Sequence, residues 1–292
     1  MSNWTMARVL DWMRQDFVAR GLPSARLDAE VLLASVLKLR RVDLYVRFDQ
    51  PLTPAELALV RGAVERRRAF EPVAYIVGQR EFYGRTMTVS PAVLVPRPET
   101  EVLIELALGA LQPTSNDTPR ETPYAVLDVG TGSGAIAITL AAERPDVILD
   151  AVDLSAEAIA IARANAATHN VSERVRFVLG SLYEPLGAAR YDLIVSNPPY
   201  IPTADIETLM PDVRAHEPHL ALDGGVSGLD LIEILLSQAR DHLVPGGTLL
   251  IEFGLGQGPA IAKLASDAGL RDVTLHDDYT HRQRVLSARA PA

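Results

Sequence analysis

The residues Asn197-Pro198-Pro199-Tyr200 are the part of this chain best suited to chemistry on a planar NH2 group. They follow a short apolar run, 191–196, which is typical of a buried strand. The two prolines lack N–H groups and fix φ, so the backbone there is stiff and can only accept hydrogen bonds. Asn197 adds a side-chain carbonyl and Tyr200 adds a flat apolar face. The pattern predicts a corner that holds an amide or exocyclic amine by both hydrogens; a plain Pro-Pro turn is the alternative.

A glycine-rich turn lies upstream, between an apolar strand and an apolar helix. It reads Gly130-Thr131-Gly132-Ser133-Gly134 and is typical of a nucleotide-binding βα unit. Glycines let the main chain approach a ligand closely, and the helix that follows presents unpaired N–H groups. With Ala135 in the last place, the loop also satisfies the relaxed dinucleotide fingerprint. An oxidoreductase that uses a nicotinamide cofactor is therefore open at this point.

An acid ends the next predicted strand, 147–153. Asp153 can accept hydrogen bonds from both hydroxyls of a ribose, and its alternative role is that of a solvated acid at a strand end. Ser155 is placed to cap the helix that follows. Because Gly130, Asp153 and Asn197 all fall at the carboxyl ends of predicted strands, we expect them to meet at one edge of a parallel sheet.

Composition limits the classes of function. The 292 residues are 48% hydrophobic and 22% charged, which describes a globular chain with apolar material for two cores. The net charge of −9 argues against sequence-independent binding to nucleic acid. The absence of cysteine excludes disulfides, thiolate nucleophiles and cysteine-based zinc sites, and the histidines show no close pairing, so no metal is expected. With no signal-peptide pattern and no membrane span, we expect a cytoplasmic protein.

Apolar spacing divides the chain into three parts. Residues 1–72 are predicted to form a small helical bundle, with Ser24 capping the second helix and a Thr53–Glu56 capping box opening the third. The cluster Arg66-Arg67-Arg68 ends that third helix, where we expect it to complement the helix end and stay solvated. Residues 73–98 are predicted to be a β-hairpin linker.

The third part, residues 99–292, alternates strands with helices, which indicates a parallel sheet covered on both faces. Residues 112–123 are polar and are predicted to be a surface linker, and the stretch after Tyr200 up to Gly225 is predicted to form a flap over the substrate. The tail, 272–288, is predicted to be an edge hairpin. Arg97 and Glu99 have two open interpretations, an acid-rich helix start or the mouth of the active site.

These motifs together resemble a known family. The glycine loop, Asp153 and the stretch at 197–200 are, in that order, similar to class I S-adenosylmethionine-dependent methyltransferases. Within that class the chain resembles the PrmC family, also called HemK, of peptide chain release factor glutamine methyltransferases. The stretches that carry this likeness span nearly the whole chain and are Pro72–Gly78, Glu81–Gly84, Pro96–Glu101, Glu217-Pro218, Ala221-Leu222, Pro245–Gly247, Glu252–Gly254 and Gln257.

The resemblance implies a Rossmann-like, mostly parallel seven-stranded sheet with helices on both faces, preceded by a helical substrate-recognition domain. It implies methylation of the glutamine side-chain amide in the Gly-Gly-Gln motif of class 1 peptide chain release factors. S-adenosyl-L-methionine would be the cofactor, S-adenosyl-L-homocysteine the product, and direct methyl displacement the reaction. We expect a monomer that acts without nucleic acid or membrane. An amino methyltransferase for an exocyclic amine of DNA or RNA is the alternative.

The resemblance also assigns roles to individual residues. It gives the methionine part of the cofactor to Gly130, Thr131, Gly132, Ser133 and Gly134, the ribose to Asp153 and the adenine to Leu182, with Asn197 also bordering the cofactor. It gives the glutamine amide to Asn197, Pro198, Pro199 and Tyr200, of which Asn197, Pro198 and Tyr200 are the expected catalytic residues, and places Arg97 and Glu99 beside the substrate.

One position departs from the family pattern. Ser181 and Leu182 stand where the family usually has an acid and a tryptophan. We therefore expect a modestly weaker affinity for the cofactor.

Overall fold

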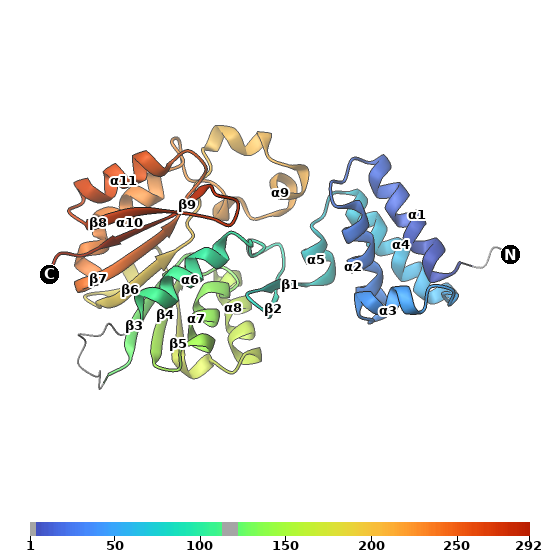
Figure 1. Ribbon diagram of the computed structural model, residues 1–292, viewed down its shortest axis with the longest axis horizontal. Coiled ribbons are helices and arrows are strands. Elements are labelled where there is room, and N and C mark those ends of the chain that lie inside the picture. The colour runs from blue at the N-terminus through green and yellow to red at the C-terminus, as the bar shows by residue number, and fades with distance from the viewer. Residues whose placement is uncertain (1–3, 113–121) are drawn as a thin grey trace. The chain divides into compact units, whose positions relative to one another are not determined.

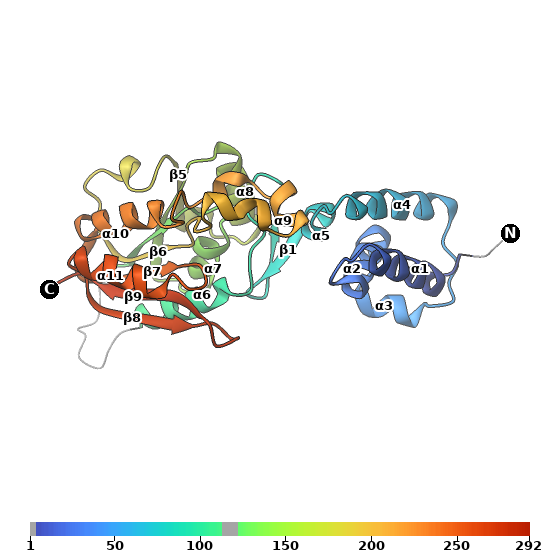
Figure 2. The same cartoon turned by 90° about the horizontal axis from the view of Figure 1, so that it is seen from above.

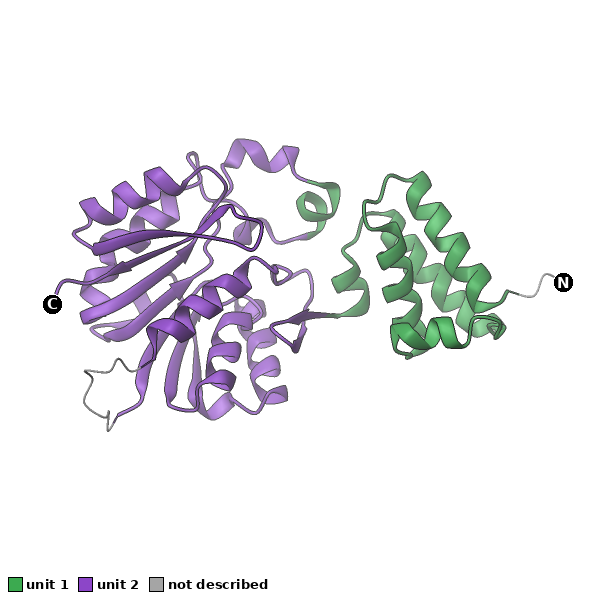
Figure 3. Cartoon of the chain, in the orientation of Figure 1, with its two compact units in different colours: residues 1–79, 210–216 green, residues 80–209, 217–292 purple. Residues whose placement is uncertain are grey.

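The computed structural model describes residues 4–112 and 122–292. The chain divides into two compact units, which Figure 3 shows in different colours. The smaller unit comprises Met1–Gln79 and Met210–His216, and the larger comprises Arg80–Leu209 and Glu217–Ala292. Of the predicted surface linker, residues 113–121 lie outside the described residues.

The smaller unit is a bundle of helices around one apolar core, which includes the buried side chains of Met13, Phe17 and Leu33. The capping box that opens α4 is confirmed, because the Thr53 hydroxyl accepts from the Glu56 N–H while the Glu56 carboxylate accepts from the Thr53 N–H. Ser24 precedes α2 but makes no capping hydrogen bond. The helices of this unit are α1 (Met6–Ala19), α2 (Ala25–Leu37), α3 (Arg41–Val46), α4 (Pro54–Arg68), α5 (Val73–Val77) and α9 (Pro211–His216).

The arginine cluster at the end of α4 is only partly solvated: Arg66 is exposed as predicted, Arg68 is half-buried, and for Arg67 the prediction was wrong. Arg67 is only 4% exposed, and its Nε donates to Asp28 Oδ2 over 2.8 Å. Arg68 donates to both carboxylate oxygens of Asp16, at 2.6 and 2.9 Å. The two acids belong to α2 and α1, far away in sequence, so no local pattern could have indicated these pairs.

The predicted hairpin is present as β1 (Gln79–Phe82) and β2 (Arg85–Thr88). Tyr83 and Gly84 turn the chain between them, both with positive φ. The first residues of the predicted hairpin linker, 73–77, form the short helix α5 and take no part in the hairpin.

A seven-stranded sheet forms the centre of the larger unit, in the order β5-β4-β3-β6-β7-β9-β8 (Figure 1). Neighbouring strands from β5 to β7 pair in parallel, and β9 pairs antiparallel with β7 and β8. The predicted mostly parallel sheet and its edge hairpin are thus confirmed. The strands are β3 (Tyr124–Val129), β4 (Val147–Asp153), β5 (Val175–Leu179), β6 (Tyr191–Ser196), β7 (Leu243–Glu252), β8 (Arg271–Asp277) and β9 (Gln283–Arg289).

Helices cover both faces of this sheet, as the two views in Figures 1 and 2 show. On one face α6, α7 and α8 pack against the strands, and on the other face α10 and α11 do so, each layer burying its own apolar core. Their bounds are α6 (Thr100–Ala110), α7 (Ala135–Glu143), α8 (Ala156–Thr168), α10 (Asp230–His242) and α11 (Gly258–Asp267). Short 3₁₀ turns lie at Ser172–Arg174, Glu184–Leu186, Thr203–Thr208 and His219–Ala221.

The order of the strands decides where a ligand can bind. The chain runs from β3 outward through β4 and β5, and then returns to the other side of β3 for β6 and β7. In open α/β sheets, ligands bind beyond the carboxyl ends of the strands at such a switch point. The segments that follow β3, β4 and β6 meet there, and these are the segments with the predicted site residues.

Candidate active site

A cavity of about 340 Å³ lies at this edge of the sheet, entirely within the larger unit. The structure brings most of the predicted site residues to its walls, and Gly134, Glu99 and Tyr200 are not among them. The predicted residues that do line the cavity are Arg97, Gly130, Thr131, Gly132, Ser133, Asp153, Leu182, Asn197, Pro198 and Pro199.

The glycine loop between β3 and α7 needs its glycines for backbone conformation. Gly130, Gly132 and Gly134 have φ of 75°, 54° and 82°, a region that favours glycine. A Cβ on Gly134 would also come within 2.7 Å of the Ile138 side chain, which shows that this glycine serves the packing of α7. The first and second glycines leave the main chain bare at the cavity.

Asp128, which sequence reasoning missed, stabilises the glycine loop through hydrogen bonds to both sides of it. This side chain is fully buried at the end of β3, and its Oδ2 accepts from the Thr131 hydroxyl at 2.7 Å and from the Ala137 N–H at 3.2 Å. Burial raises the pKa of the Asp128 carboxyl to about 7. A charged residue inside the apolar run before the glycines could have indicated that Asp128 is buried and has a structural role.

Asp153 joins the ends of two strands. Its Oδ2 accepts from the Gly132 N–H at 2.8 Å, and its Oδ1 accepts from the Ser155 N–H at 2.9 Å. The predicted cap is confirmed, since the Ser155 hydroxyl accepts from the Ala158 N–H at 3.1 Å. Each carboxylate oxygen keeps a further lone pair, so Asp153 can still accept from a ligand in the cavity.

The corner after β6 carries two free acceptors. Asn197 Nδ2 donates to the Thr100 hydroxyl oxygen at 3.1 Å. Among the residues that the structure describes, none donates to Asn197 Oδ1 or to the carbonyl oxygen of Pro198. Pro198 and Pro199 have no N–H to offer. The corner can therefore accept hydrogen bonds from two N–H groups of a ligand, because no N–H group of the prolines occupies these oxygens.

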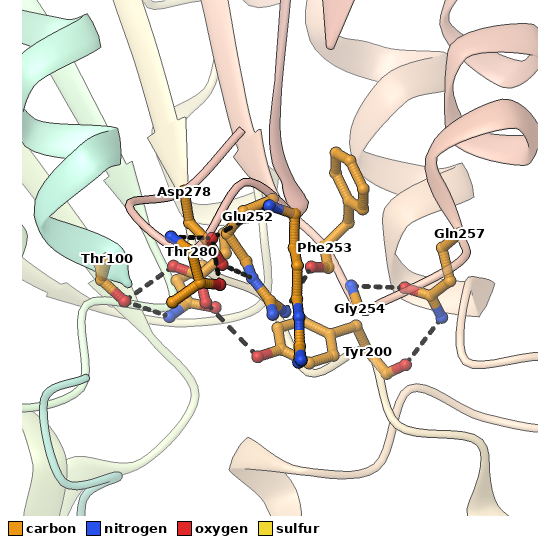
Figure 4. A network of polar contacts seen from close by, with 11 residues as sticks. Thr100, Tyr200, Glu252, Phe253, Gly254, Gln257, Asp278 and Thr280 are labelled. Carbon is orange, nitrogen blue, oxygen red and sulfur yellow. Dashed lines mark hydrogen bonds and ion pairs between the residues drawn. The ribbon is translucent and has the colours of Figure 1, made fainter. Parts of the chain in front are cut away.

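A buried chain of hydrogen bonds runs from Thr100 through Glu252 to Tyr200 (Figure 4). The Thr100 hydroxyl donates to Glu252 Oε2 at 2.7 Å, and the Tyr200 hydroxyl donates to Glu252 Oε1 at 3.4 Å. Glu252 ends β7 and is 1% exposed, and this burial raises the pKa of its carboxyl to about 7. Thr100 and Glu252 occur in stretches that resemble the family, but sequence gave no sign that these two residues touch.

Tyr200 is held behind the cavity rather than in its wall. Its carbonyl oxygen accepts from Gln257 Nε2 at 2.9 Å, while Gln257 Oε1 accepts from the Gly254 N–H at 2.7 Å (Figure 4). Burial raises the pKa of the Tyr200 phenol, so the hydroxyl keeps its proton and serves as a donor to Glu252.

Arg97 ties a segment of the predicted flap to the cavity. Its Nη2 donates to Glu217 Oε1 at 2.6 Å, and the Glu217 side chain is only 2% exposed. The residues directly after Glu217 then line the cavity at Pro218, Leu220 and Ala221. Of the two interpretations for Arg97 and Glu99, the structure places Arg97 at the cavity and Glu99 at the residue before α6.

Among residues 4–112 and 122–292, no cluster of three metal-ligating side chains occurs, and no helix is both long and apolar enough to cross a membrane.

The fold is that of a class I methyltransferase. A methyltransferase from Pyrococcus furiosus superposes with a TM-score of 0.53 at 19% identity, covering 80% of this chain and 98% of the other. The family model described as "Methyltransferase small domain" matches residues 114–214, and the model described as "PrmC N-terminal domain" matches residues 8–78.

Full-length relatives narrow the class further. The release factor glutamine methyltransferase of Geobacter sulfurreducens is 46% identical over 98% of this chain and 97% of its own length. The release factor glutamine methyltransferase of Cereibacter sphaeroides is 43% identical over 94% of each chain. The chain therefore belongs to the family of release factor glutamine methyltransferases, and the nicotinamide oxidoreductase left open by the glycine loop is set aside.

Proposed function

We propose that this chain transfers a methyl group to the side-chain amide nitrogen of the glutamine in the Gly-Gly-Gln motif of class 1 peptide chain release factors. The observation that supports this best is the pair of free acceptors on Asn197 and Pro198, beside a cavity lined by the glycine loop. A primary carboxamide offers two N–H groups on one nitrogen, which matches two acceptors on adjacent residues.

The residues at the cavity fit S-adenosylmethionine. Asp153 has lone pairs for ribose hydroxyls, Leu154 and Leu182 offer apolar faces for the adenine, and the bare backbone of Gly130 and Gly132 leaves room for the methionine part. When bound, this molecule supplies a methyl group on a positively charged sulfur. The departure at Ser181 and Leu182 keeps the apolar contact and omits the acid, so we retain the expectation of modestly weaker affinity.

The substrate's amide nitrogen is a poor nucleophile, and the residues of this chain must activate it. An amide nitrogen shares its lone pair with the carbonyl group, and it gains positive charge as it forms a bond to the methyl carbon while the carbon–sulfur bond breaks. Asn197 Oδ1 and the Pro198 carbonyl accept its two N–H groups, orient the lone pair and stabilise the developing charge. One proton then leaves the alkylated nitrogen for water, so no general base is required.

Positioning contributes the larger share of the rate. Holding two reactants in line is worth about 7–11 kcal/mol, more than one hydrogen bond supplies. The stiff Pro198-Pro199 backbone and the hydrogen bond from Gln257 Nε2 to the Tyr200 carbonyl keep the corner in place. Arg97, through Glu217, holds the segment that closes one side of the cavity, and Glu99 stays assigned to the substrate side.

We assign residues 1–72 to recognition of the release factor, 73–98 to the linker and 99–292 to catalysis. The enzyme acts as a cytoplasmic monomer on a protein substrate, and nucleic acid takes no direct part in binding.

Transfer of labelled methyl groups tests the proposal. The protein is incubated with methyl-labelled S-adenosylmethionine and, separately, with a release factor, its Gly-Gly-Ala variant, DNA or RNA. We expect label on the intact release factor alone, with the added mass on the glutamine side chain. Label on DNA or RNA, or equal label on the Gly-Gly-Ala variant, would overturn the proposal.

A further inference from the structure

The hydrogen bonds behind Asn197 have a direction that depends on Glu252. Thr100 has one hydroxyl proton, and it lies between Asn197 Nδ2 at 3.1 Å and Glu252 Oε2 at 2.7 Å. An ionised Glu252 can only accept, so Thr100 must donate to it and can only accept from Asn197. The NH2 group of Asn197 then faces Thr100, and its carbonyl oxygen faces the cavity.

A protonated Glu252 removes this constraint. Its hydroxyl can donate to Thr100, and Thr100 can then donate to the side-chain oxygen of Asn197. In that arrangement the carboxamide of Asn197 is turned over and presents its NH2 group to the cavity. Two NH2 groups that face each other cannot hydrogen-bond, so the substrate amide loses one of its two acceptors.

Groups from several elements set the charge on Glu252. The Thr100 and Tyr200 hydroxyls and the Arg284 guanidinium on β9 favour the carboxylate, whereas burial and the nearby Glu99 favour the acid. Arg284 is itself held by the Phe253 carbonyl at 3.1 Å and by Asp278, with Nε 3.6 Å from Oδ2. The balance leaves Glu252 with a pKa near 7, within reach of ordinary changes of pH.

We propose that Glu252 is a positioning residue whose carboxylate, acting through the Thr100 hydroxyl, turns the Asn197 carboxamide oxygen toward the substrate. This inference rests on the proposed function, because it assumes that the substrate presents N–H groups to Asn197. Glu252 itself lies behind Thr100, takes no proton from the substrate and has no contact with the reacting atoms.

The relay is the pair of hydrogen bonds that joins Glu252 to Thr100 and Thr100 to Asn197, and paired variants with the release factor as substrate test it. Thr100→Ser keeps the hydroxyl and should keep the single-turnover rate, while Thr100→Val keeps the shape and should lower the rate by about 10²-fold, as misplacement of an aligned group does. The wild-type rate should fall as pH is lowered and Glu252 gains a proton. Glu252→Gln should be slow with no such fall, and the exposed Glu173→Gln should follow the wild type.

Two outcomes separate this inference from the proposed function. A wild-type enzyme that labels no release factor contradicts the proposed function. If the wild-type enzyme labels the release factor, two results contradict only the relay. One is a Thr100→Val variant as fast as Thr100→Ser, and the other is a Glu252→Gln variant whose rate still falls as pH is lowered. S-adenosylhomocysteine affinity, measured by calorimetry, should be equal in all folded variants, because the relay touches neither Asp153 nor the glycine loop.

A measurement without turnover tests the relay in the wild-type protein itself. In wild-type protein labelled with ¹⁵N-asparagine, the side-chain amide signals of Asn197 should shift with pH, and the shift should be absent in Glu252→Gln. The signals are assigned by their loss in Asn197→Ala. Asn197 signals that stay constant across the pH range in which the enzyme gains activity would overturn the proposal.

Discussion

Replacing Asn197 with alanine should slow methyl transfer while leaving the cofactor site intact. Asn197 Oδ1 is one of two free acceptors at the corner, and it would stabilise charge that exists only as the new bond forms. One such hydrogen bond contributes about 2.7–4 kcal/mol to the transition state, which corresponds to about 10²–10³ in rate. The change also removes the donor to Thr100, which costs about 1 kcal/mol of folding free energy.

The assay is single-turnover methylation of a release factor under saturating S-adenosylmethionine, combined with calorimetry for the product S-adenosylhomocysteine. We expect the rate constant to fall by about 10²–10³ and the dissociation constant to change little, because Asn197 bonds to neither Asp153 nor the glycine loop. A rate within about threefold of the wild type, in a variant that unfolds at a similar denaturant concentration, would refute the role given to the side-chain oxygen.

Three further predictions follow from particular contacts. Asp153→Ala should weaken S-adenosylmethionine binding by about tenfold or more, since charge-assisted bonds contribute about 1.5–3 kcal/mol each; unchanged affinity by calorimetry would leave Asp153 a loop-fixing residue only, and Asp267→Ala, an exposed acid on α11, is the matched control. Arg97→Ala should lower the free energy of unfolding by about 1–3 kcal/mol, because it leaves Glu217 buried without this partner; denaturant titration should show recovery when Glu217→Gln is added, and no recovery would contradict the pairing. Stability should fall as pH rises from about 4.5 toward 7, because folded Glu252 and Asp128 keep protons that the unfolded chain releases. Glu252→Gln should reduce this pH dependence of the free energy of unfolding by about 3 kcal/mol, the equivalent of a pKa raised from 4.5 to about 7. Denaturant titrations at pH 5 and pH 8 measure it. If the free energy of unfolding changed between these pH values by the same amount in the variant as in the wild type, the burial argument would be contradicted.

The sequence predicted the features that depend on local pattern. Strand, glycine loop and helix around Gly130 follow from apolar runs broken by glycines, and the capping residues Ser155 and Thr53 were identified from spacing alone. Because parallel strands end at one edge of the sheet, the meeting of Gly130, Asp153 and Asn197 at one cavity could also be predicted.

Contacts between residues far apart in the chain could not be predicted. The hydrogen bond from Thr100 to Glu252 spans 152 positions, and the pairing of Arg67 with Asp28 joins two helices whose packing no local pattern specifies. The helices α3 and α5, of six and five residues, are too short to show a helical period. At the site, the contacts that could not be predicted are therefore those between the side chains that position the site residues, such as Thr100 and Glu252.

A structure of the complex with S-adenosylhomocysteine and a Gly-Gly-Gln peptide tests the central claim most directly. We predict that the glutamine side-chain nitrogen lies within about 3.2 Å of both Asn197 Oδ1 and the Pro198 carbonyl oxygen. We also predict that this nitrogen faces the sulfur across the place of the transferred methyl group. A glutamine amide that binds elsewhere, or that meets the NH2 group of Asn197 in place of its oxygen, would contradict the account.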